Sequence, residues 1–330
     1  MTKKALIIGI DDYSEYPLKG CVKDAVSVSK LLDSHGNGDP NFSVIELLSS
    51  ECDVTYELML ESMKKLFSGD AETAVLYFAG HGIIDETTNH GHLVSQDGKK
   101  PGWGVSLSEV LALANAAYPK IKSSVIILDC CHSGKLGEPD RVGAKGTAEI
   151  GTGVTILTAC HRDEAAMEGQ YGGVFTDLLV DGLSGGCADI RGNITPASIY
   201  SYVDQTLGSW EQRPIYKANV QNFITLRKVS SKIPDETLRR LPKLFPDRSS
   251  IFSLNPTFEP DRNNIPEEFR ALPVNEDNVR VFKELQLLNR HGLVVPDGAE
   301  HMYYAAIDSK GCKLTALGAH YRKLAEMKRI

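Results

Sequence analysis

The sequence predicts an α/β fold in which helices flank a mostly parallel sheet, followed by a small α+β module. Three observations support this prediction. Four short apolar runs lie in the first half of the chain, at residues 5–10, 74–80, 124–130 and 153–159. Helical patterns lie between these runs. The runs are continuous rather than alternating in polarity, which is typical of strands covered on both faces of a parallel sheet.

The helical patterns alternate with the strands in chain order. Residues 22–34 and 54–67 each place apolar side chains on one stripe of a helix. Asp53 or Thr55 could cap the second of these helices. Residues 106–117, 174–184 and 195–207 predict three further helices, and residues 222–227 (NFITLR) predict another strand.

The sequence changes character after residue 228. Residues 229–275 mix prolines with charges, and we expect a linker or an irregular wrap there. Residues 276–330 predict a small module with a helix over 277–292, two strand-like pieces around Pro296–Gly298 and a final helix over 314–328. We therefore expect a large domain over 1–228, a linker or wrap over 229–275 and a C-terminal module over 276–330.

The composition is that of an ordinary globular protein. Of the 330 residues, 42% are hydrophobic, and the net charge of −7 gives no general attraction to nucleic acid or to anionic membranes. The seven cysteines include no C-x-x-C pair, so neither a disulfide framework nor a zinc site is indicated. Asp11 and Asp12 interrupt the N-terminal apolar run, which disfavours a secretory signal. No stretch is long and apolar enough to span a membrane, and we expect a cytoplasmic protein.

Two of the predicted strands end in chemically reactive residues. The sequence AGHG (79–82) follows one strand, and DCCHSG (129–134) follows the next. Neighbouring parallel strands end at the same edge of a sheet, so we expect an exposed and mobile His81 to meet a thiol there. The imidazole can take the proton of the thiol and later return it to the leaving amine. We expect the backbone N–H groups of Gly82 and Cys131 to hold the oxyanion.

These motifs resemble those of the caspase–metacaspase family of cysteine peptidases. YFAGHG (77–82) and LDCCHSG (128–134) are similar to its histidine and cysteine motifs, and His81 precedes Cys131 by the caspase spacing (131 − 81 = 50). Residues 5–25 resemble its first strand and the Gly-Cys-x-x-Asp turn after it, and residues 155–183 resemble the start of its small subunit. The likeness covers about residues 4–227. It implies a caspase-like fold and a cysteine endopeptidase with a Cys–His dyad.

The resemblance also selects the nucleophile. In this family the nucleophilic cysteine directly precedes His-Ser-Gly, which is Cys131 in this chain. Alternation of side chains along an extended segment agrees, because it places Asp129 on the same side as Cys131. Cys130 then points away, and we expect it to be a small buried hydrophobe.

A pocket for the P1 side chain is implied in the same way. Metacaspases bind a basic P1 residue with acidic side chains, and the matching positions are Cys21, Asp24, Ala79 and Asp129. A pair of carboxylates binds guanidinium in a bidentate manner, so we expect cleavage of proteins after Arg and less readily after Lys. Ala79 stands where metacaspases often have serine. Asp24 could instead be a charge favoured by a helix N-terminus, and Asp129 could bond backbone amides at a turn.

Two regulatory features are left open. Residues 135–153 are a polar loop with Arg141 and Lys145, which is either an ordinary loop or the self-cleavage segment of a zymogen. Some metacaspases need calcium, and the candidate ligands after the histidine motif are Asp85, Glu86 and Asp97, without a dense cluster. We expect no organic cofactor or resident metal otherwise, because neither a G-x-G-x-x-G loop nor a Walker sequence is present.

The C-terminal module allows two alternative functions. Residues 288–294 and 313–326 resemble the wing and the last helix of winged-helix modules. No clear recognition helix with polar readers is evident, so we expect a protein-docking or autoinhibitory module, with DNA binding as the alternative. Six basic residues make this end locally basic: Lys310, Lys313, Arg322, Lys323, Lys328 and Arg329.

Two other classes of function compete with the enzyme. One is a catalytically silent caspase-fold adaptor that recruits partners through the C-terminal module, and the intact Cys131 and His81 argue against it. The other is a DNA-bound regulator, which the acidic net charge disfavours. Bacterial relatives with this layout are often tied to stress or defence, so the resemblance implies a role in stress, defence or cell-death signalling.

Overall fold

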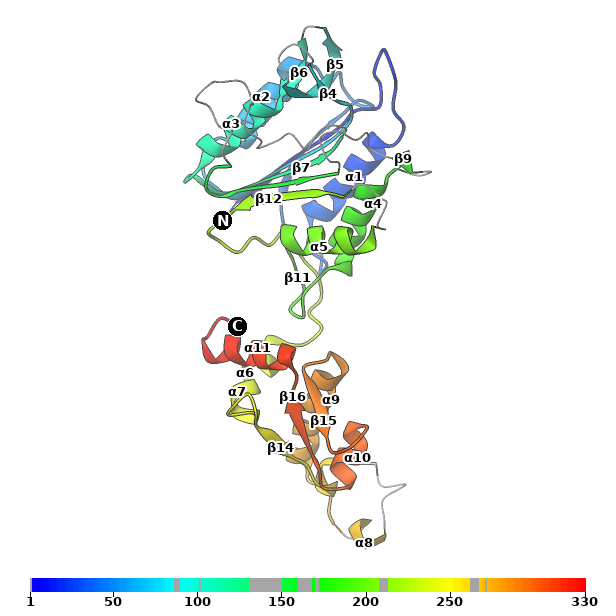
Figure 1. Ribbon diagram of the computed structural model, residues 1–330, viewed down its shortest axis with the longest axis vertical. Coiled ribbons are helices and arrows are strands. Elements are labelled where there is room, and N and C mark those ends of the chain that lie inside the picture. The colour runs from blue at the N-terminus through cyan, green and yellow to red at the C-terminus, as the bar shows by residue number, and fades with distance from the viewer. Residues whose placement is uncertain are drawn as a thin grey trace. The chain divides into compact units, whose positions relative to one another are not determined.

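A computed structural model describes residues 2–85, 90–100, 102–130, 150–159, 168–169, 172–207, 213–261, 267–270 and 272–330. The chain forms two compact units, Met1–Ser230 and Ser231–Ile330. Figure 1 shows the first in blue to green and the second in yellow to red. In the described part of the chain, no helix combines the length and the apolarity needed to cross a membrane.

A six-stranded sheet, ordered β12-β8-β7-β3-β1-β2, forms the centre of the first unit. The four predicted strands are its four inner strands, and all pair in parallel, as expected for a parallel α/β sheet. The two edge strands were not predicted, and β12 runs antiparallel to β8. The bounds are β1 Lys3–Gly9, β2 Ser43–Leu48, β3 Ala71–Ala79, β7 Ile121–Asp129, β8 Val154–Thr158 and β12 Ile215–Asn219.

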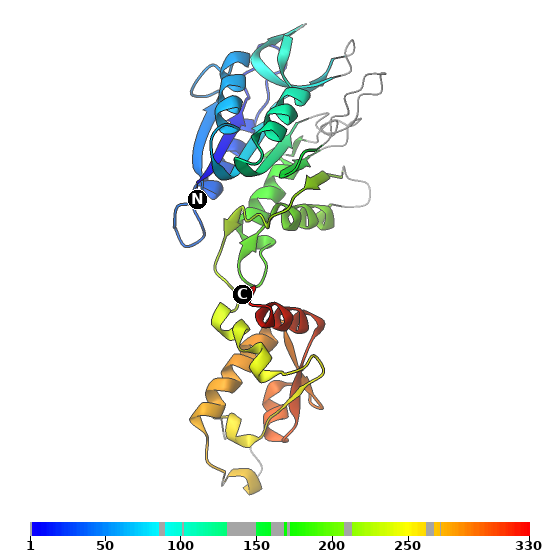
Figure 2. The same ribbon diagram turned by 90° about the vertical axis from the view of Figure 1, so that its left-hand side faces the viewer.

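Helices cover both faces of this sheet, as Figures 1 and 2 show. Leu6 and Ile8 of β1 belong to the core under α2 and α3, whereas Ala5 and Ile7 belong to the core under α1, α4 and α5. The continuous apolar run of β1 therefore reflects burial on both sides. The bounds are α1 Cys21–Asp33, α2 Tyr56–Leu66, α3 Leu107–Ala117, α4 Val174–Asp181 and α5 Pro196–Thr206.

Helix starts follow local capping chemistry. Thr55 is the residue that caps α2, because its hydroxyl accepts the N–H of Leu58. Ser106 forms a capping box with Glu109 at the start of α3. The predicted helix over 174–184 is α4, and a π-helical turn at Gly182–Gly186 follows it directly.

Several small strands surround the main sheet. A three-stranded antiparallel sheet of β4 (Gly82–Ile84), β5 (Gly91–Lys99) and β6 (Gly102–Ser106) follows the histidine motif. Of the strand expected over 222–227, only Arg227 is extended, in the two-residue β13 (Arg227–Lys228) that pairs with β11 (Asn193–Ile194). The expected longer strand is therefore wrong. A further pair is β9 (Glu168–Gly169) with β10 (Gly172–Gly173).

The second unit includes most of the segment that we expected as a linker or wrap. That segment supplies β14 (Ile251–Ser253), which pairs with β16 (Gly311–Leu314) of the C-terminal module, so it is not a free linker. The sheet order is β14-β16-β15, with β15 at Val294–Asp297. The helices are α6 Asp235–Arg239, α7 Leu241–Leu244, α8 Glu267–Arg270, α9 Glu276–Arg290, α10 Met302–Ile307 and α11 Ala316–Glu326, with a 3₁₀ turn at Pro256–Phe258.

One detail of the second unit corrects the sequence prediction. Of the two strand-like pieces expected around Pro296–Gly298, only β15 is there, because α10 intervenes before β16 begins at Gly311. The core contains a row of aromatic rings with centroids 5.9–6.4 Å apart. Its members are Phe245, Phe252, Phe258 and Phe282. The resemblance to winged-helix modules stays a prediction.

Candidate active site

The two motif-bearing strands lie side by side and end together. β3 pairs in parallel with β7, and Ala79 is aligned with Asp129. His81 therefore follows β3 at the sheet edge where Cys130 follows β7. Cys131, the next residue, lies outside the described residues, as do His132, Arg141 and Lys145.

The backbone of His81 is held on both sides. Its N–H donates to the hydroxyl of Tyr13 (3.0 Å), and its carbonyl accepts the N–H of Val94 (3.0 Å). The Tyr13 hydroxyl in turn donates to the Val94 carbonyl (3.1 Å), and the Tyr13 and His81 rings lie 4.6 Å apart. The side chain of His81 is partly exposed, while β5 and Tyr13 hold its backbone.

The glycine at position 80 is explained by the space around it. A Cβ atom at this position would lie 2.5 Å from the Tyr13 hydroxyl. Glycine before the histidine therefore makes room for the tyrosine that positions it. Gly82, on the other side, begins β4 and pairs with Leu93.

The imidazole of His81 has a defined tautomer. Its Nε2 lies 2.6 Å from the backbone carbonyl oxygen of Tyr16, in the loop between β1 and α1. A carbonyl oxygen only accepts hydrogen bonds, so Nε2 carries the hydrogen. In the neutral ring Nδ1 then holds a lone pair and is the basic nitrogen. The side chain is therefore set up to accept a proton at Nδ1.

The start of α1 is held by a carboxylate from the loop before it. Asp11 accepts the N–H groups of Cys21 (2.9 Å) and Val22 (3.2 Å). Gly20 occupies the N-cap position and has no side chain to do this. The loop between β1 and α1 thus fixes Cys21 and Asp24, in the first turn of α1, as well as the carbonyl that contacts His81.

Asp129 faces the α1 and α4 side of the sheet. The hydroxyl of Thr176 in α4 donates to Asp129 Oδ2 (2.6 Å), and Thr176 also bonds the hydroxyl of Tyr77 (2.7 Å). Cys130 packs in the core on the opposite face, under α2 and α3, and is 2% exposed. Neighbouring side chains thus alternate across the end of β7, as they do along a strand.

Burial and neighbouring carboxylates raise the pKa values of several groups in this region. Burial raises the pKa of Asp129, hydrogen bonds from Thr176 lower it, and the charge of Asp177 raises it further. Burial also raises the pKa of the Cys21 thiol, with added contributions from Asp11, Asp129 and Asp24. The pKa of Tyr77 is raised by burial first, and then by Asp129 and Asp24.

The expected pocket residues lie in the first turn of α1 and at the aligned ends of β3 and β7. The carboxylates of Asp24 and Asp129 both raise the pKa of Cys21 and the pKa of Tyr77. Ala79 lies in the same core as Tyr77, on the α1 face of β3. The side chain of Asp24 is 6% exposed and that of Ala79 is 1% exposed.

Of the three calcium candidates, the structure describes Asp85 and Asp97. Asp97 accepts the N–H of Tyr56 (2.9 Å) and so holds the start of α2, while Asp85 is buried after β4. Glu86 lies outside the described residues. Within the ranges that the structure describes, no three or more His, Cys, Asp and Glu side chains are grouped to hold a metal ion.

Sequence reasoning missed four residues of this site. Tyr13 and Tyr16 lie in a loop that carries no sequence motif for this role, and they reach His81 only through the fold. Tyr77 and Thr176 carry hydroxyls within an otherwise apolar strand and helix. Such a hydroxyl needs a partner when it is buried, which is the one signal that could have been used.

Comparison with known proteins shows the family to which the chain belongs. The caspase domain family matches residues 2–225, and the chain belongs to this family of cysteine peptidases. The structure of the protein GSU0716 from Geobacter sulfurreducens shares the fold: at 14% identity and a TM-score of 0.50, the match covers 70% of this chain and 98% of that one. Caspase-1 from Spodoptera frugiperda is 15% identical over 69% of this chain and 91% of its own, with a TM-score of 0.48. The comparison with curated proteins found no match.

Proposed function

We propose that this protein is a cysteine endopeptidase that cleaves proteins after Arg, and less readily after Lys. Cys131 attacks the scissile carbonyl, and His81 takes and returns the proton. The oxyanion is held by the backbone N–H groups of Gly82 and Cys131. The observation that carries the proposal is the bond from His81 Nε2 to the Tyr16 carbonyl, because it leaves Nδ1 as a base beside the strand that leads to Cys131.

The preference for a basic P1 residue is supported by the acidic region beside this edge. Asp24 is buried and Asp129 is partly buried, and burial raises the pKa of Asp129. A guanidinium group between such carboxylates would offset part of the cost of burying their charge. It can also donate two parallel hydrogen bonds to one carboxylate. Lysine carries a single ammonium group and cannot make that bidentate contact.

A library of peptides that differ only in the P1 residue tests both parts of the proposal. We expect cleavage after Arg and Lys in wild type, and a loss of about 10²–10⁴-fold in His81→Ala, which is the range of general-base catalysis. Cys131→Ala should abolish cleavage. A folded wild-type protein that cleaves none of the peptides would favour the adaptor function, and cleavage after Asp would contradict the pocket.

Calcium and self-processing are tested with the same protein. The digest is run with calcium and with a chelator, because calcium dependence is a separate property of some metacaspases. We propose that wild type also cuts itself after Arg141 or Lys145, and that Cys131→Ala stays intact. A wild-type protein that remains one band while it cleaves peptides would show that the loop is not a processing segment.

The proposal also covers the location of the protein, its role in the cell and the use of its C-terminal module. We propose that the protein acts in the cytoplasm, in stress, defence or cell-death signalling, and that its C-terminal module docks a protein partner. A salt-dependent shift of DNA by the full-length protein, lost on substitution of Lys323 and Lys328, would favour DNA binding instead.

A further inference from the structure

A pocket with acidic residues lies in the first unit, away from the strand ends. It is formed between the last turns of α1 and the first part of β2, and its volume is about 410 Å³. Val44 and Glu46 align with the middle of β1, whereas His81 and Asp129 lie beyond or at the carboxyl ends of their strands. At 1.5 Å per residue, the part of α1 that lines the pocket is roughly 8–14 Å from Asp24. The lining residues are Ser29, Lys30, Asp33, Val44 and Glu46.

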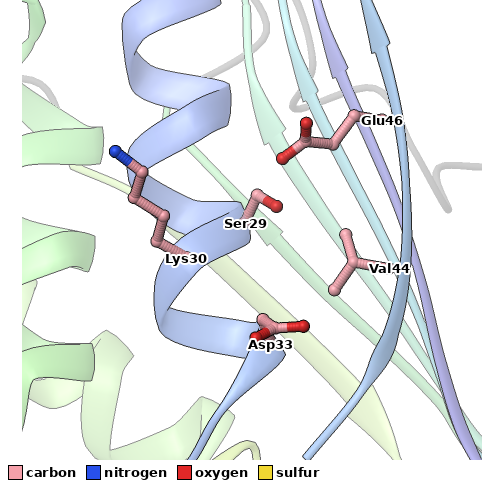
Figure 3. A pocket seen from close by; sticks show the side chains of 5 residues that line it. All are labelled: Ser29, Lys30, Asp33, Val44 and Glu46. Carbon is pink, nitrogen blue, oxygen red and sulfur yellow. The ribbon is translucent and has the colours of Figure 1, made fainter.

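Oxygen atoms from both elements converge in this pocket. In Figure 3 the carboxylate of Glu46 reaches from β2 toward the helix, and the hydroxyl of Ser29 points toward β2. The carboxylate of Asp33 lies one turn further along the same side of α1, while the ammonium group of Lys30 points away. The pocket is therefore acidic even though a lysine is among its residues.

Ser29 is the most informative of these residues. The residue is only 5% exposed, but its hydroxyl is not among the buried polar atoms without a partner in the described residues, so it is open to the pocket. A hydroxyl that faces the pocket beside two carboxylates offers a third oxygen atom to a group that carries hydrogen-bond donors and positive charge.

The oxygen atoms of the pocket indicate which kind of cation it can bind. Two carboxylates and one hydroxyl fall short of the oxygen ligands that calcium takes, and the described residues hold no group of three metal-binding side chains. An ammonium or guanidinium group satisfies the same oxygens with its N–H donors. Val44 supplies an apolar surface for the aliphatic stem of a Lys or Arg side chain.

The backbone beside the pocket favours a polypeptide. β2 is an edge strand, and within the described ranges it pairs only with β1. An added strand would place every second side chain beside Val44 and Glu46. The side chain between them would cover Ile45, which faces the other side of the sheet and is 55% exposed. A basic residue followed by an apolar one fits this edge.

We propose that the pocket and the outer edge of β2 form an accessory binding site for an extended segment of another protein. The segment adds a strand to β2, places an Arg or Lys side chain between Glu46, Asp33 and Ser29, and covers Ile45 with the next residue. The site is separate from the P1 pocket and does not depend on peptidase activity.

Binding of a fluorescently labelled peptide with alternating arginine and valine tests the proposal. Fluorescence anisotropy is measured with the full-length Cys131→Ala protein at physiological salt, with and without Asp129→Asn. We expect Glu46→Gln and Asp33→Asn each to weaken binding by about tenfold, because each removes a charge-assisted hydrogen bond. Asp129→Asn should leave the affinity for this site unchanged.

Lys30→Met is the matched control. It alters the same helix and the same pocket but removes a positive charge, so binding should be equal or tighter. Hydrogen exchange of the backbone amides of residues 43–48 should slow when the peptide binds. Three results would overturn the proposal: unchanged affinity in both carboxylate variants, loss of all binding in Asp129→Asn, or amides of β2 that gain no protection.

Discussion

Thr176 connects two polar side chains that lie within an apolar environment. It donates to Asp129 Oδ2 at 2.6 Å and bonds the Tyr77 hydroxyl at 2.7 Å, and Tyr77 and Thr176 are fully buried. The direction of the Asp129 carboxylate therefore depends on a hydroxyl from a different helix. On the proposed function, Thr176 is a positioning residue for the P1 pocket.

Thr176→Val tests this role, because valine keeps the shape and removes the hydroxyl. A hydrogen bond to a charged group contributes about 1.5–3 kcal/mol, so we expect kcat/KM for Arg peptides to fall by about 10- to 100-fold, mainly through KM. Thr176→Ser should retain most of the activity. A valine variant with wild-type KM would show that Thr176 only fills space.

Asp129 should reduce the stability of the folded protein at neutral pH. Burial raises its pKa, so the native state holds its proton more tightly than the unfolded state does. Stability then decreases as pH rises from the unfolded pKa of about 4 through the raised native pKa. We expect Asp129→Asn to raise the melting temperature, by more at pH 8 than at pH 4, while cleavage after Arg is lost. A variant that is less stable than wild type at pH 8 would contradict this.

At the scale of elements, α1 carries residues of both proposed binding regions. Its first turn holds Cys21 and Asp24 at the candidate active site, and its last turns hold Ser29 and Asp33 of the pocket between α1 and β2. The position of α1 depends on Gly9, where a Cβ atom would lie 2.6 Å from the Cys21 carbonyl oxygen and 2.7 Å from the Ala25 Cβ. The helix can lie this close to β1 only because residue 9 has no side chain.

Gly9→Ala should therefore move the helix as well as destabilise the fold. Overpacking of this kind costs about 1–3 kcal/mol in free energy of unfolding. We expect hydrogen exchange to show this loss of stability in the first unit. KM for Arg peptides should rise in the same variant, because Asp24 moves with α1. Gly102→Ala is the control, since the nearest atom to its Cβ is 4.0 Å away. Equal effects of the two substitutions would refute the steric argument.

At the scale of the whole molecule, each unit has a core of its own. The first unit buries two apolar clusters, one on each face of its sheet. The second packs aromatic rings from the C-cap of α7, from β14, from the 3₁₀ turn and from α9 into one row. A single free energy of unfolding does not describe a chain of this kind.

Phe282→Ala should lower the stability of the second unit. Phe282 is 1% exposed, and removal of such a side chain costs about 3–5 kcal/mol. We expect faster hydrogen exchange in residues 276–330 and unchanged exchange in β3 and β7. Faster exchange in both units to the same extent would show that they unfold together.

The sequence by itself determined the class of fold, the family and the order of the site motifs. Continuous apolar runs mark the four inner strands because these are buried on both faces, and AGHG and DCCHSG are local patterns. The edge strands β2 and β12 escaped prediction because, among the described strands, each has a partner on one side only, and several of their side chains are exposed. Only tertiary pairing places them.

The tertiary structure alone decided how the site residues are oriented. Tyr16 and His81 are 65 positions apart in sequence, and Thr176 and Asp129 are 47 apart. Hydrogen bonds between such distant residues leave no periodic signal, because each exists only once the sheet has aligned the ends of its strands. The same holds for the pocket between α1 and β2, whose oxygen atoms meet only when the helix packs against the sheet.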